Sequence, residues 1–211
     1  MRGNDQIPTA DIFSLIPRAM SWAHTRWIQK SYPFAGFGRG VSIHYSCDIS
    51  RRHAPGIDVG DRVYLARDVW LNALPDGNSL NPKIVLGAGC EIGRRSTISS
   101  KNLIVLQEDV LLAPSVLIMD HNHEFSDVER PIRKQGITPG GTVIIGKNCW
   151  LGSSSVVLCG RGQLMIGRNS VIGANSVVTS SFPPYSLIAG NPARLLKSYD
   201  SQSKEWVKVH A

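Results

Sequence analysis

A six-residue period between Val143 and Val178 limits what this chain can fold into. An aliphatic residue opens each six and glycine follows it, and the clearest pairs are Ile145-Gly146, Leu151-Gly152, Ile166-Gly167 and Ile172-Gly173. Six residues fit neither the 3.6-residue period of an α-helix nor the two-residue alternation of a strand, so the pattern indicates a repeat architecture. We expect a chain that coils through three short faces per turn and buries the aliphatic residues in a continuous column. Each glycine would relieve crowding at a corner or allow an unusual backbone angle.

The period extends over most of residues 41–178 and has three interruptions. The stretch Ala73–Lys83 is rich in Pro, Gly and Asn and predicts a loop at a corner. Residues 119–142 lack the period altogether, and a loop this long within a compact repeat is usually functional. Between Val157 and Met165 the chain takes nine residues where the period asks for six, which predicts a short bulge.

The closing run VIGANSVVTSSFPPYSLIAGNPARLLK, residues 171–197, resembles the C-terminal signature of the hexapeptide-repeat acyltransferases. The resemblance covers residues 40–197. Within the family, the sequence is most similar to sugar and polysaccharide O-acetyltransferases of the maltose, galactoside, colanic-acid and capsule type. It implies an all-β fold, a left-handed parallel β-helix of hexapeptide repeats. Left-handed crossovers between parallel strands are rare, so the handedness comes from the resemblance.

The expected organisation is an N-terminal tail and helical cap over residues 1–40, a β-helix acyltransferase domain over 41–198 with its loop at 119–142, and a C-terminal tail over 199–211. The segment from Thr9 has helical spacing, with Thr9 or Asp11 as N-cap and Pro17 as a break or kink. We interpret it as a helix that covers the end of the coil, and contact with a membrane surface is the alternative. The C-terminal tail is expected to be polar, with one helical turn at most.

Composition narrows the choice of partners and compartment. The formal net charge is +7, yet no run of Lys and Arg exceeds two residues, so we do not expect nucleic acid and favour an anionic small ligand. The four cysteines form no CxxC pair, and Cys90 and Cys149 occupy inward or corner places typical of buried thiols. No apolar run reaches transmembrane length and no signal-peptide pattern opens the chain, so we expect a cytoplasmic protein.

Two histidines at the start of the long loop, His121 and His123, are the candidate catalytic residues. A histidine titrates near neutral pH and can take a proton from an attacking hydroxyl or amine. The resemblance implies a catalytic histidine at this point of the chain. The run HEFSDVER, residues 123–130, is similar to the HPLDPAER-like run of the sugar acetyltransferases and favours His123, whereas DHNH keeps His121 as the alternative. Asp120, Glu124 or Asp127 could orient the base or hold the acceptor, and the alternative for each is a solvated carboxylate of the loop.

The resemblance also implies acetyl-CoA as co-substrate, bound between neighbouring subunits of a homotrimer. Trp150 and Ser153 would flank the acyl end, and Ala174 and Thr179 would offer backbone groups to the pantetheine arm. Arg194 and Lys197 would meet the nucleotide phosphates, where cations are required. Ser180 stands where members of the family often carry lysine, a departure at one phosphate contact.

The expected function is acetyl transfer from coenzyme A to a hydroxyl of a sugar or surface polysaccharide, with direct attack on the thioester and no acyl-enzyme. N-acetylation of an amino sugar or an antibiotic is one alternative, and a non-catalytic binding or scaffold protein is another. No metal is expected. The γ-type carbonic anhydrases share the coil, but two of their three zinc-binding imidazoles lie about five residues apart on one chain. His121 and His123 are two apart, and His44 and His53 lie several coils earlier.

Overall fold

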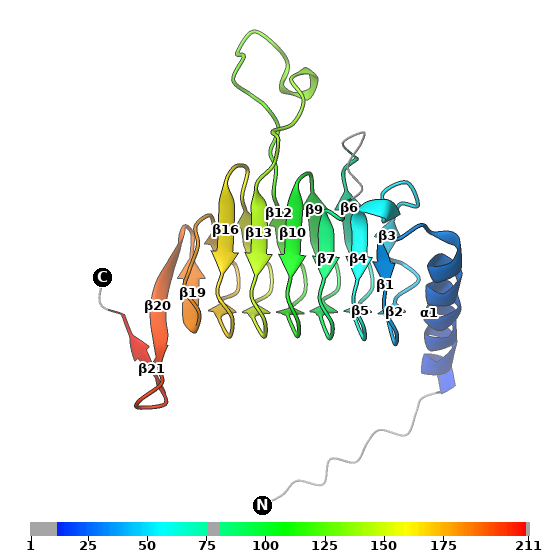
Figure 1. Ribbon diagram of the computed structural model, residues 1–211, viewed down its shortest axis with the longest axis horizontal. Coiled ribbons are helices and arrows are strands. Elements are labelled where there is room, and N and C mark those ends of the chain that lie inside the picture. Colours follow the sequence, from blue (N-terminus) through cyan, green and yellow to red (C-terminus); the bar gives the residue numbers. More distant parts are fainter. Residues whose placement is uncertain (1–11, 76–80, 210–211) are drawn as a thin grey trace, which may run out of the picture.

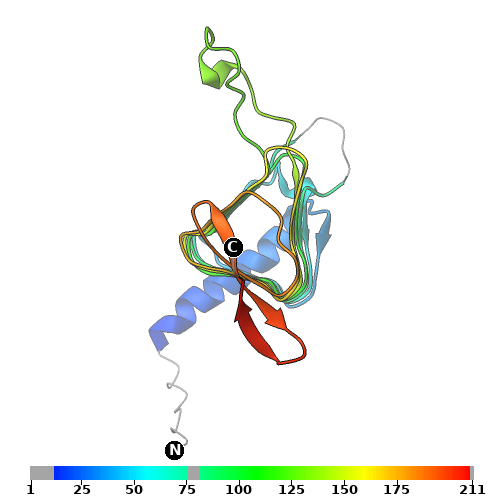
Figure 2. The ribbon, with the colours of Figure 1, turned by 90° about the vertical axis from the view of Figure 1, so that its left-hand side faces the viewer.

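Three β-sheets form a triangular prism in the computed structural model, which describes residues 12–75 and 81–209 (Figures 1 and 2). Sheet A contains β1 (Gly36–Phe37), β4 (Ile57–Val59), β7 (Ile84–Leu86), β10 (Leu103–Leu106), β13 (Thr142–Ile145) and β16 (Gln163–Ile166). Sheet B begins with β2 (Ser42–Ile43), β5 (Tyr64–Leu65), β8 (Glu91–Ile92), β11 (Leu111–Leu112), β14 (Trp150–Leu151) and β17 (Val171–Ile172). Sheet C contains β3 (Asp48–Ile49), β6 (Trp70–Ala73), β9 (Thr97–Ser100), β12 (Leu117–Met119), β15 (Val156–Leu158) and β18 (Val177–Val178).

Each turn of the chain contributes one strand to each sheet in the order A, B, C, and every strand of these sets pairs in parallel with its equivalent on the next turn. The aliphatic residues of the period lie inside the prism. Ile145 and Ile166 are register partners in sheet A, Leu151 and Ile172 are partners in sheet B, and all four are fully buried. Burial of such a side chain stabilises the fold by about 1.5–3 kcal/mol relative to exposure. The left-handed parallel β-helix expected from the sequence is confirmed.

The corners show which of the two expected roles glycine has, relief of crowding or an unusual backbone angle. At the corner between sheets A and B, a Cβ on Gly146 would come within 2.5 Å of the backbone nitrogen of Arg168 on the next turn. Gly146 does not have a positive φ, whereas Asn148, two places later, has a φ of 56°. Glycine is therefore required here for the close approach of successive turns, and asparagine, which tolerates the left-handed region, makes the bend.

Helix α1 (Ile12–Ser31) lies across the N-terminal end of the coils (Figure 1). Thr25 and Ile28 are buried against the first turn, and the Thr25 hydroxyl accepts a hydrogen bond of 2.9 Å from the backbone nitrogen of Ile43. The helix continues through Pro17, so a break there is wrong and the alternative of a kink stays a prediction. Pro17 lies near the start of the helix and removes only one backbone hydrogen bond there. The N-caps expected at Thr9 or Asp11 lie outside the described residues.

The C-terminal segment is a β-hairpin rather than the expected helical turn. After β18, strand β19 (Ser186–Gly190) extends sheet B in parallel, and β20 (Ala193–Asp200) and β21 (Glu205–Lys208) then add in antiparallel order. Tyr199 and Trp206 are directly opposite each other, with ring centroids 5.7 Å apart in an edge-to-face arrangement. Such cross-strand aromatic pairs stabilise antiparallel strands, and they explain why this polar segment is extended.

The thiols expected to be buried are buried. Cys90 and Cys149 face the core, and burial raises the pKa of each thiol to about 11. A thiol with such a pKa is almost wholly protonated at neutral pH and is a poor nucleophile. These two cysteines are therefore packing residues.

Candidate active site

Every long connection of the β-helix leaves from one corner, the corner between sheets C and A (Figure 2). Here the loop that contains residues 74–83 leaves after β6, the bulge of residues 159–162 leaves after β15, and residues 120–141 leave after β12. Residues 76–80 of the first loop lie outside the described residues. We call residues 120–141 the arm, and Figure 1 shows it projecting well beyond the coils. Between β9 and β10, in contrast, the corner closes in two residues, Lys101 and Asn102.

Asp120, the first residue of the arm, is fully buried beneath this tight turn. Its Oδ1 accepts a hydrogen bond from the backbone nitrogen of Lys101 at 2.7 Å. Its Oδ2 accepts bonds from the backbone nitrogen of Asn102 at 2.9 Å and from the Ser100 hydroxyl at 2.6 Å. Burial raises the pKa of this carboxyl, but its hydrogen bonds with His121, Ser100 and the turn outweigh burial and hold the pKa below its ordinary value. Asp120 is therefore a carboxylate at neutral pH.

His121 lies directly on this carboxylate. Its Nδ1 is 2.9 Å from Asp120 Oδ1, and only 8% of the residue is exposed. A carboxylate only accepts hydrogen bonds, so Nδ1 must carry the proton of that bond. The neutral ring then has its lone pair on Nε2, which has no hydrogen-bond partner within the described part of the chain. The geometry gives His121 the tautomer and fixed orientation that a general base needs.

His123 has a different environment. It is exposed, and its backbone forms an isolated antiparallel bridge with Ile137 on the returning half of the arm. Among residues 12–75 and 81–209, no hydrogen bond reaches its side chain. Within the described residues, a carboxylate is therefore hydrogen-bonded to the side chain of His121 and none to that of His123.

The base of the arm is held closed by a ladder of hydrogen bonds. The backbone nitrogen of Gly141 donates to Asp120 O at 2.7 Å, and that of Thr138 donates to Asn122 O at 2.8 Å. The Asn102 amide also donates to Gly141 O at 3.0 Å. The same residue thus binds the arm where it begins, through Asp120, and where it ends. This ladder fixes the backbone on both sides of His121.

The other two carboxylates considered for the base serve the arm itself. Asp127 accepts a bond of 3.0 Å from the backbone nitrogen of Glu129. Glu124 lies 3.6 Å from the guanidinium of Arg161, which belongs to the bulge after β15. The nine-residue spacing that predicts this bulge thus brings a cation to the base of the arm.

The residues predicted to bind coenzyme A are divided between two sides of the prism. Trp150 projects from sheet B and is 49% exposed, and Arg194 and Lys197 are on β20 of the same sheet. Ser153 and Ala174 are exposed on successive turns at the corner between sheets B and C. The backbone nitrogens of these two residues donate no hydrogen bond within the described residues. Thr179 follows β18 and lies at the same corner as the arm. One chain therefore does not bring His121 and Trp150 together, because the corner between sheets C and A lies opposite sheet B.

Sequence reasoning missed the residues that hold Asp120. Ser100 and Asn102 lie 18 to 20 residues before Asp120 in the chain and reach it only because the coils stack. Their local signal is the pair Ser99-Ser100, two successive buried polar residues. Among the described residues, no group of three or more His, Cys, Asp and Glu side chains is arranged to hold a metal ion. No helix among residues 12–75 and 81–209 is long and apolar enough to cross a membrane.

Comparison with known proteins agrees with this fold. Residues 142–180 match the family model described as the hexapeptide repeat of succinyl-transferase. The chain is 38% identical over 118 residues to the putative lipopolysaccharide biosynthesis O-acetyl transferase WbbJ of Escherichia coli (strain K12), covering 53% of this chain and 59% of that protein. It is 33% identical over 126 residues to the galactoside O-acetyltransferase of the same organism, covering 57% and 59%. The chain thus spans about three-fifths of the length of these two curated relatives.

A solved structure is similar over most of the chain. The N-acyltransferase AntD from Bacillus cereus, in complex with dTDP and 3-hydroxybutyryl-CoA, superposes with a TM-score of 0.66 at 18% identity, over 85% of this chain and 89% of that one. At this identity the likeness supports the fold alone. Together with the family model, these matches confirm the resemblance to the hexapeptide-repeat acyltransferases that the period and the closing motif predict.

Proposed function

We propose that this protein is an acyltransferase that moves an acetyl or other short acyl group from coenzyme A to a hydroxyl of a sugar. The observation that carries the proposal is the pair of Asp120 and His121, a buried carboxylate 2.9 Å from an imidazole nitrogen at the base of the arm. A scaffold protein has no need of a histidine held in this way. The relatives named above are a lipopolysaccharide and a galactoside O-acetyltransferase, which supports a sugar acceptor.

In the proposed reaction His121 is the general base. Its Nε2 takes the proton of the acceptor hydroxyl as the oxygen attacks the thioester carbonyl, and the imidazolium that forms is stabilised by the Asp120 carboxylate. The carbon–sulfur bond then breaks, and the coenzyme A thiolate receives the proton from His121. The products are an acyl ester and free coenzyme A. The complete burial of Asp120 strengthens its interaction with the imidazolium.

We place the acyl donor along the residues predicted from the sequence, namely Trp150, Ser153, Ala174, Thr179, Arg194 and Lys197. The free backbone nitrogen of Ser153 is the proposed donor to the developing oxyanion. These residues lie mostly on sheet B and its corner with sheet C, whereas His121 lies at the corner between sheets C and A. A complete site then needs His121 of one copy and sheet B of another, which supports the homotrimer implied by the resemblance.

Two measurements on the purified protein test this function. Calorimetric titration with acetyl-CoA and with free coenzyme A measures donor binding, and thiol release in the presence of a panel of sugars measures transfer. We expect micromolar binding and sugar-stimulated release. Absence of both would contradict the proposal and favour the scaffold alternative.

The same assay distinguishes hydroxyl from amine acceptors. An amine with a lowered pKa is a nucleophile without a base, so His121→Ala would reduce transfer to an amino sugar much less than transfer to a hydroxyl. We expect a large loss with the best acceptor. A small loss with an amino sugar, together with little transfer to plain sugars, would favour the N-acetyltransferase alternative.

A further inference from the structure

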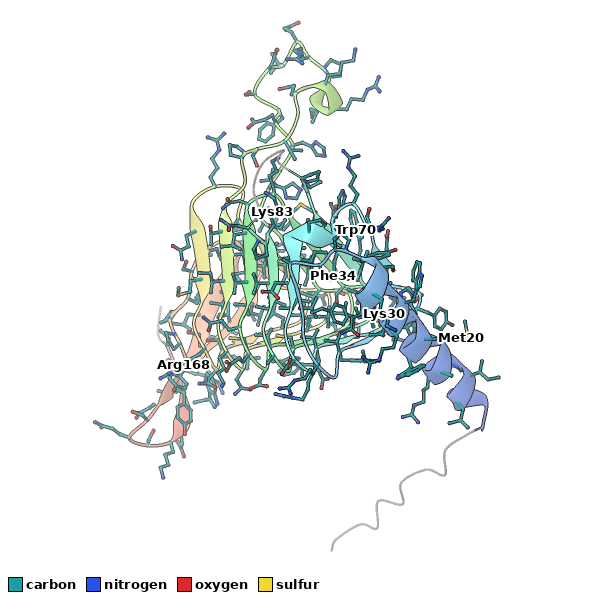
Figure 3. The ribbon with its side chains drawn as sticks, turned by 45° about the vertical axis from the view of Figure 1, so that its right-hand side comes forward. Met20, Lys30, Phe34, Trp70, Lys83 and Arg168 are labelled. Atoms are coloured by element: carbon teal, nitrogen blue, oxygen red, sulfur yellow. The ribbon has the colours of Figure 1, made fainter. Side chains whose placement is uncertain are left out.

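Helix α1 buries one face on the coils and leaves another without a partner. Thr25 and Ile28 point to the first turn, but Ile16, Met20 and Trp27 are 63%, 47% and 57% exposed. With Ala23 these residues recur at intervals of four, three and four, so they form one stripe along the helix. Figure 3 shows α1 projecting from the end of the coils, with the labelled Met20 on its outer half. Residues 15–20 are all exposed.

The charges of α1 are of one sign. Arg18, Arg26 and Lys30 are its charged side chains, and the helix contains no Asp or Glu. All three are exposed, and none forms an ion pair within the described part of the chain. A second copy of α1 on this stripe would bring six cations together with no acid to offset them, so the charge pattern disfavours self-association through the helix.

A groove of about 540 Å³ lies between α1 and the start of sheet B. Arg18 and Arg26 stand on its helix side, with the rings of Trp22 and Tyr64 close by. Guanidinium groups bind phosphate oxygens in a bidentate manner, and tryptophan is enriched at the interface between lipid and water. The groove therefore offers an anion site of headgroup chemistry on the side of α1 that contains Thr25, across the helix from the apolar stripe.

We propose that α1 binds the surface of a bilayer that contains anionic phospholipid. The stripe of Ile16, Met20 and Trp27 enters the boundary between headgroups and acyl chains. Arg26 and Lys30 flank the stripe and contact lipid phosphates, and Arg18 on the far side of the helix adds to the attraction of the anionic surface. The helix lies in the interface rather than crossing it, in keeping with its limited apolarity. Thr25 and Ile28 stay on the coils, so the same helix covers the end of the prism and holds it to the membrane.

The tip of the arm offers a natural comparison. It also exposes apolar side chains, Phe125 at 69% and Val128 at 90%, and carries Arg130, Arg133 and Lys134. Its cations follow the carboxylates of Asp127 and Glu129 in the same segment, whereas α1 contains no carboxylate. Neutralising three cations here makes the same change in net charge as on α1, so it controls for nonspecific attraction.

The test is co-sedimentation of the full chain with vesicles of phosphatidylcholine alone and with vesicles that also contain about 30% phosphatidylglycerol, an anionic lipid. We expect binding to the anionic vesicles and little to the neutral ones. Combined Arg18→Gln, Arg26→Gln and Lys30→Gln should weaken partition on the order of 100-fold, about fivefold per cation. Arg130→Gln, Arg133→Gln and Lys134→Gln together should change it less than about threefold, since no membrane contact is proposed there.

A second pair of variants tests the apolar stripe. Ile16→Ser with Trp27→Ser should weaken partition at least about tenfold, and Phe125→Ser with Val128→Ser should not. Thermal melting checks that each variant is folded, and light scattering measures its oligomeric state. Equal loss in the α1 and arm variants, or no binding of the unmodified chain to anionic vesicles, would overturn the proposal. A stripe variant that changes the oligomeric state and leaves vesicle binding intact would assign the stripe to a second copy instead.

Discussion

Two corners of the same prism follow different rules. At the corner between sheets B and C each connection has four residues, such as 113–116 and 152–155, and successive turns have the same shape. At the corner between sheets C and A the connections range from the two residues 101–102 to the arm of 120–141. The regular corner packs backbone against backbone, while the irregular corner buries Asp120 and presents His121. The repeat supplies a rigid frame, and the candidate chemistry is where the repeat is interrupted.

The largest expected effect is the loss of acyl-transfer rate when a histidine of the irregular corner is replaced. His121→Ala should lower kcat for acyl transfer by about 10²–10⁴, the usual contribution of a general base. His123→Ala should change kcat by less than about threefold, because its side chain is exposed and has no carboxylate beside it. Steady-state thiol release with saturating acetyl-CoA measures both. A larger loss in the His123 variant would reverse the assignment.

The next largest effect is on stability, and it distinguishes the coils of the β-helix, which we call the frame, from the arm. Leu151→Ala should lower the free energy of unfolding by about 2–5 kcal/mol, because it empties part of a fully buried column. Val128→Ala at the 90% exposed arm tip should change it by no more than about 0.5 kcal/mol. Urea unfolding followed by circular dichroism measures the two. Equal losses would mean that the arm packs on the frame or on a neighbouring copy.

A smaller effect concerns Asp120. Asp120→Asn replaces one accepting oxygen by an NH₂ that faces backbone N–H groups, and it should cost about 1.5–3 kcal/mol of stability at neutral pH. Because the pKa of Asp120 is lowered in the folded chain, its charge stabilises the fold above the ordinary carboxyl value of 3.8. The difference between wild type and variant should therefore shrink as the pH falls below that value toward the lower folded pKa.

Asp127→Asn is the matched control, since Asp127 is an exposed arm carboxylate with one backbone partner. Its effect on unfolding should stay within about 0.5 kcal/mol. Chemical unfolding between neutral and acidic pH compares both variants with wild type. A cost for Asp120→Asn that does not vary with pH would show that the carboxylate charge has no part in holding the turn.

The smallest expected effect is within the arm tip. The Gln135 amide nitrogen donates to the carbonyls of Asp127 and Arg130 at 2.7 and 2.8 Å, and its oxygen accepts from the backbone nitrogen of Asp127 at 3.0 Å. Gln135→Ala should speed amide hydrogen exchange in residues 125–135 and leave exchange in the coils unchanged. Slower exchange, or a change that spreads to sheet A, would contradict the separation of arm and frame.

The frame was predictable because its information is local. The six-residue spacing alone predicts which aliphatic side chains point into the prism, and the four clearest are fully buried: Ile145, Leu151, Ile166 and Ile172. The glycines could be located but not explained, since a close approach between Gly146 and Arg168 depends on the next turn. A break at Pro17 and a helical turn in the C-terminal tail were predicted wrongly, because local propensity was overridden by position in the helix and by pairing with β19.

The candidate site was predictable only in part. The sequence located both histidines, but likeness to a known run favoured His123, whereas the contacts of Asp120 favour His121. Those contacts come from Ser100, Lys101 and Asn102 on the previous turn, and the local sequence pattern around Asp120 does not predict them. The residues predicted for the acyl donor remain a prediction, and their separation from His121 becomes visible only once the three sheets are in place.

The central claim is that a buried carboxylate fixes His121 as the tautomer with a free Nε2. Nitrogen-15 NMR of protein labelled at histidine, with His121→Gln used to assign the signal, measures that tautomer directly. We predict that His121 of the wild type carries its proton on Nδ1 and that Asp120→Asn shifts the ring toward a mixture of tautomers. A proton on Nε2 in the wild type, or a tautomer that does not respond to Asp120→Asn, would contradict it.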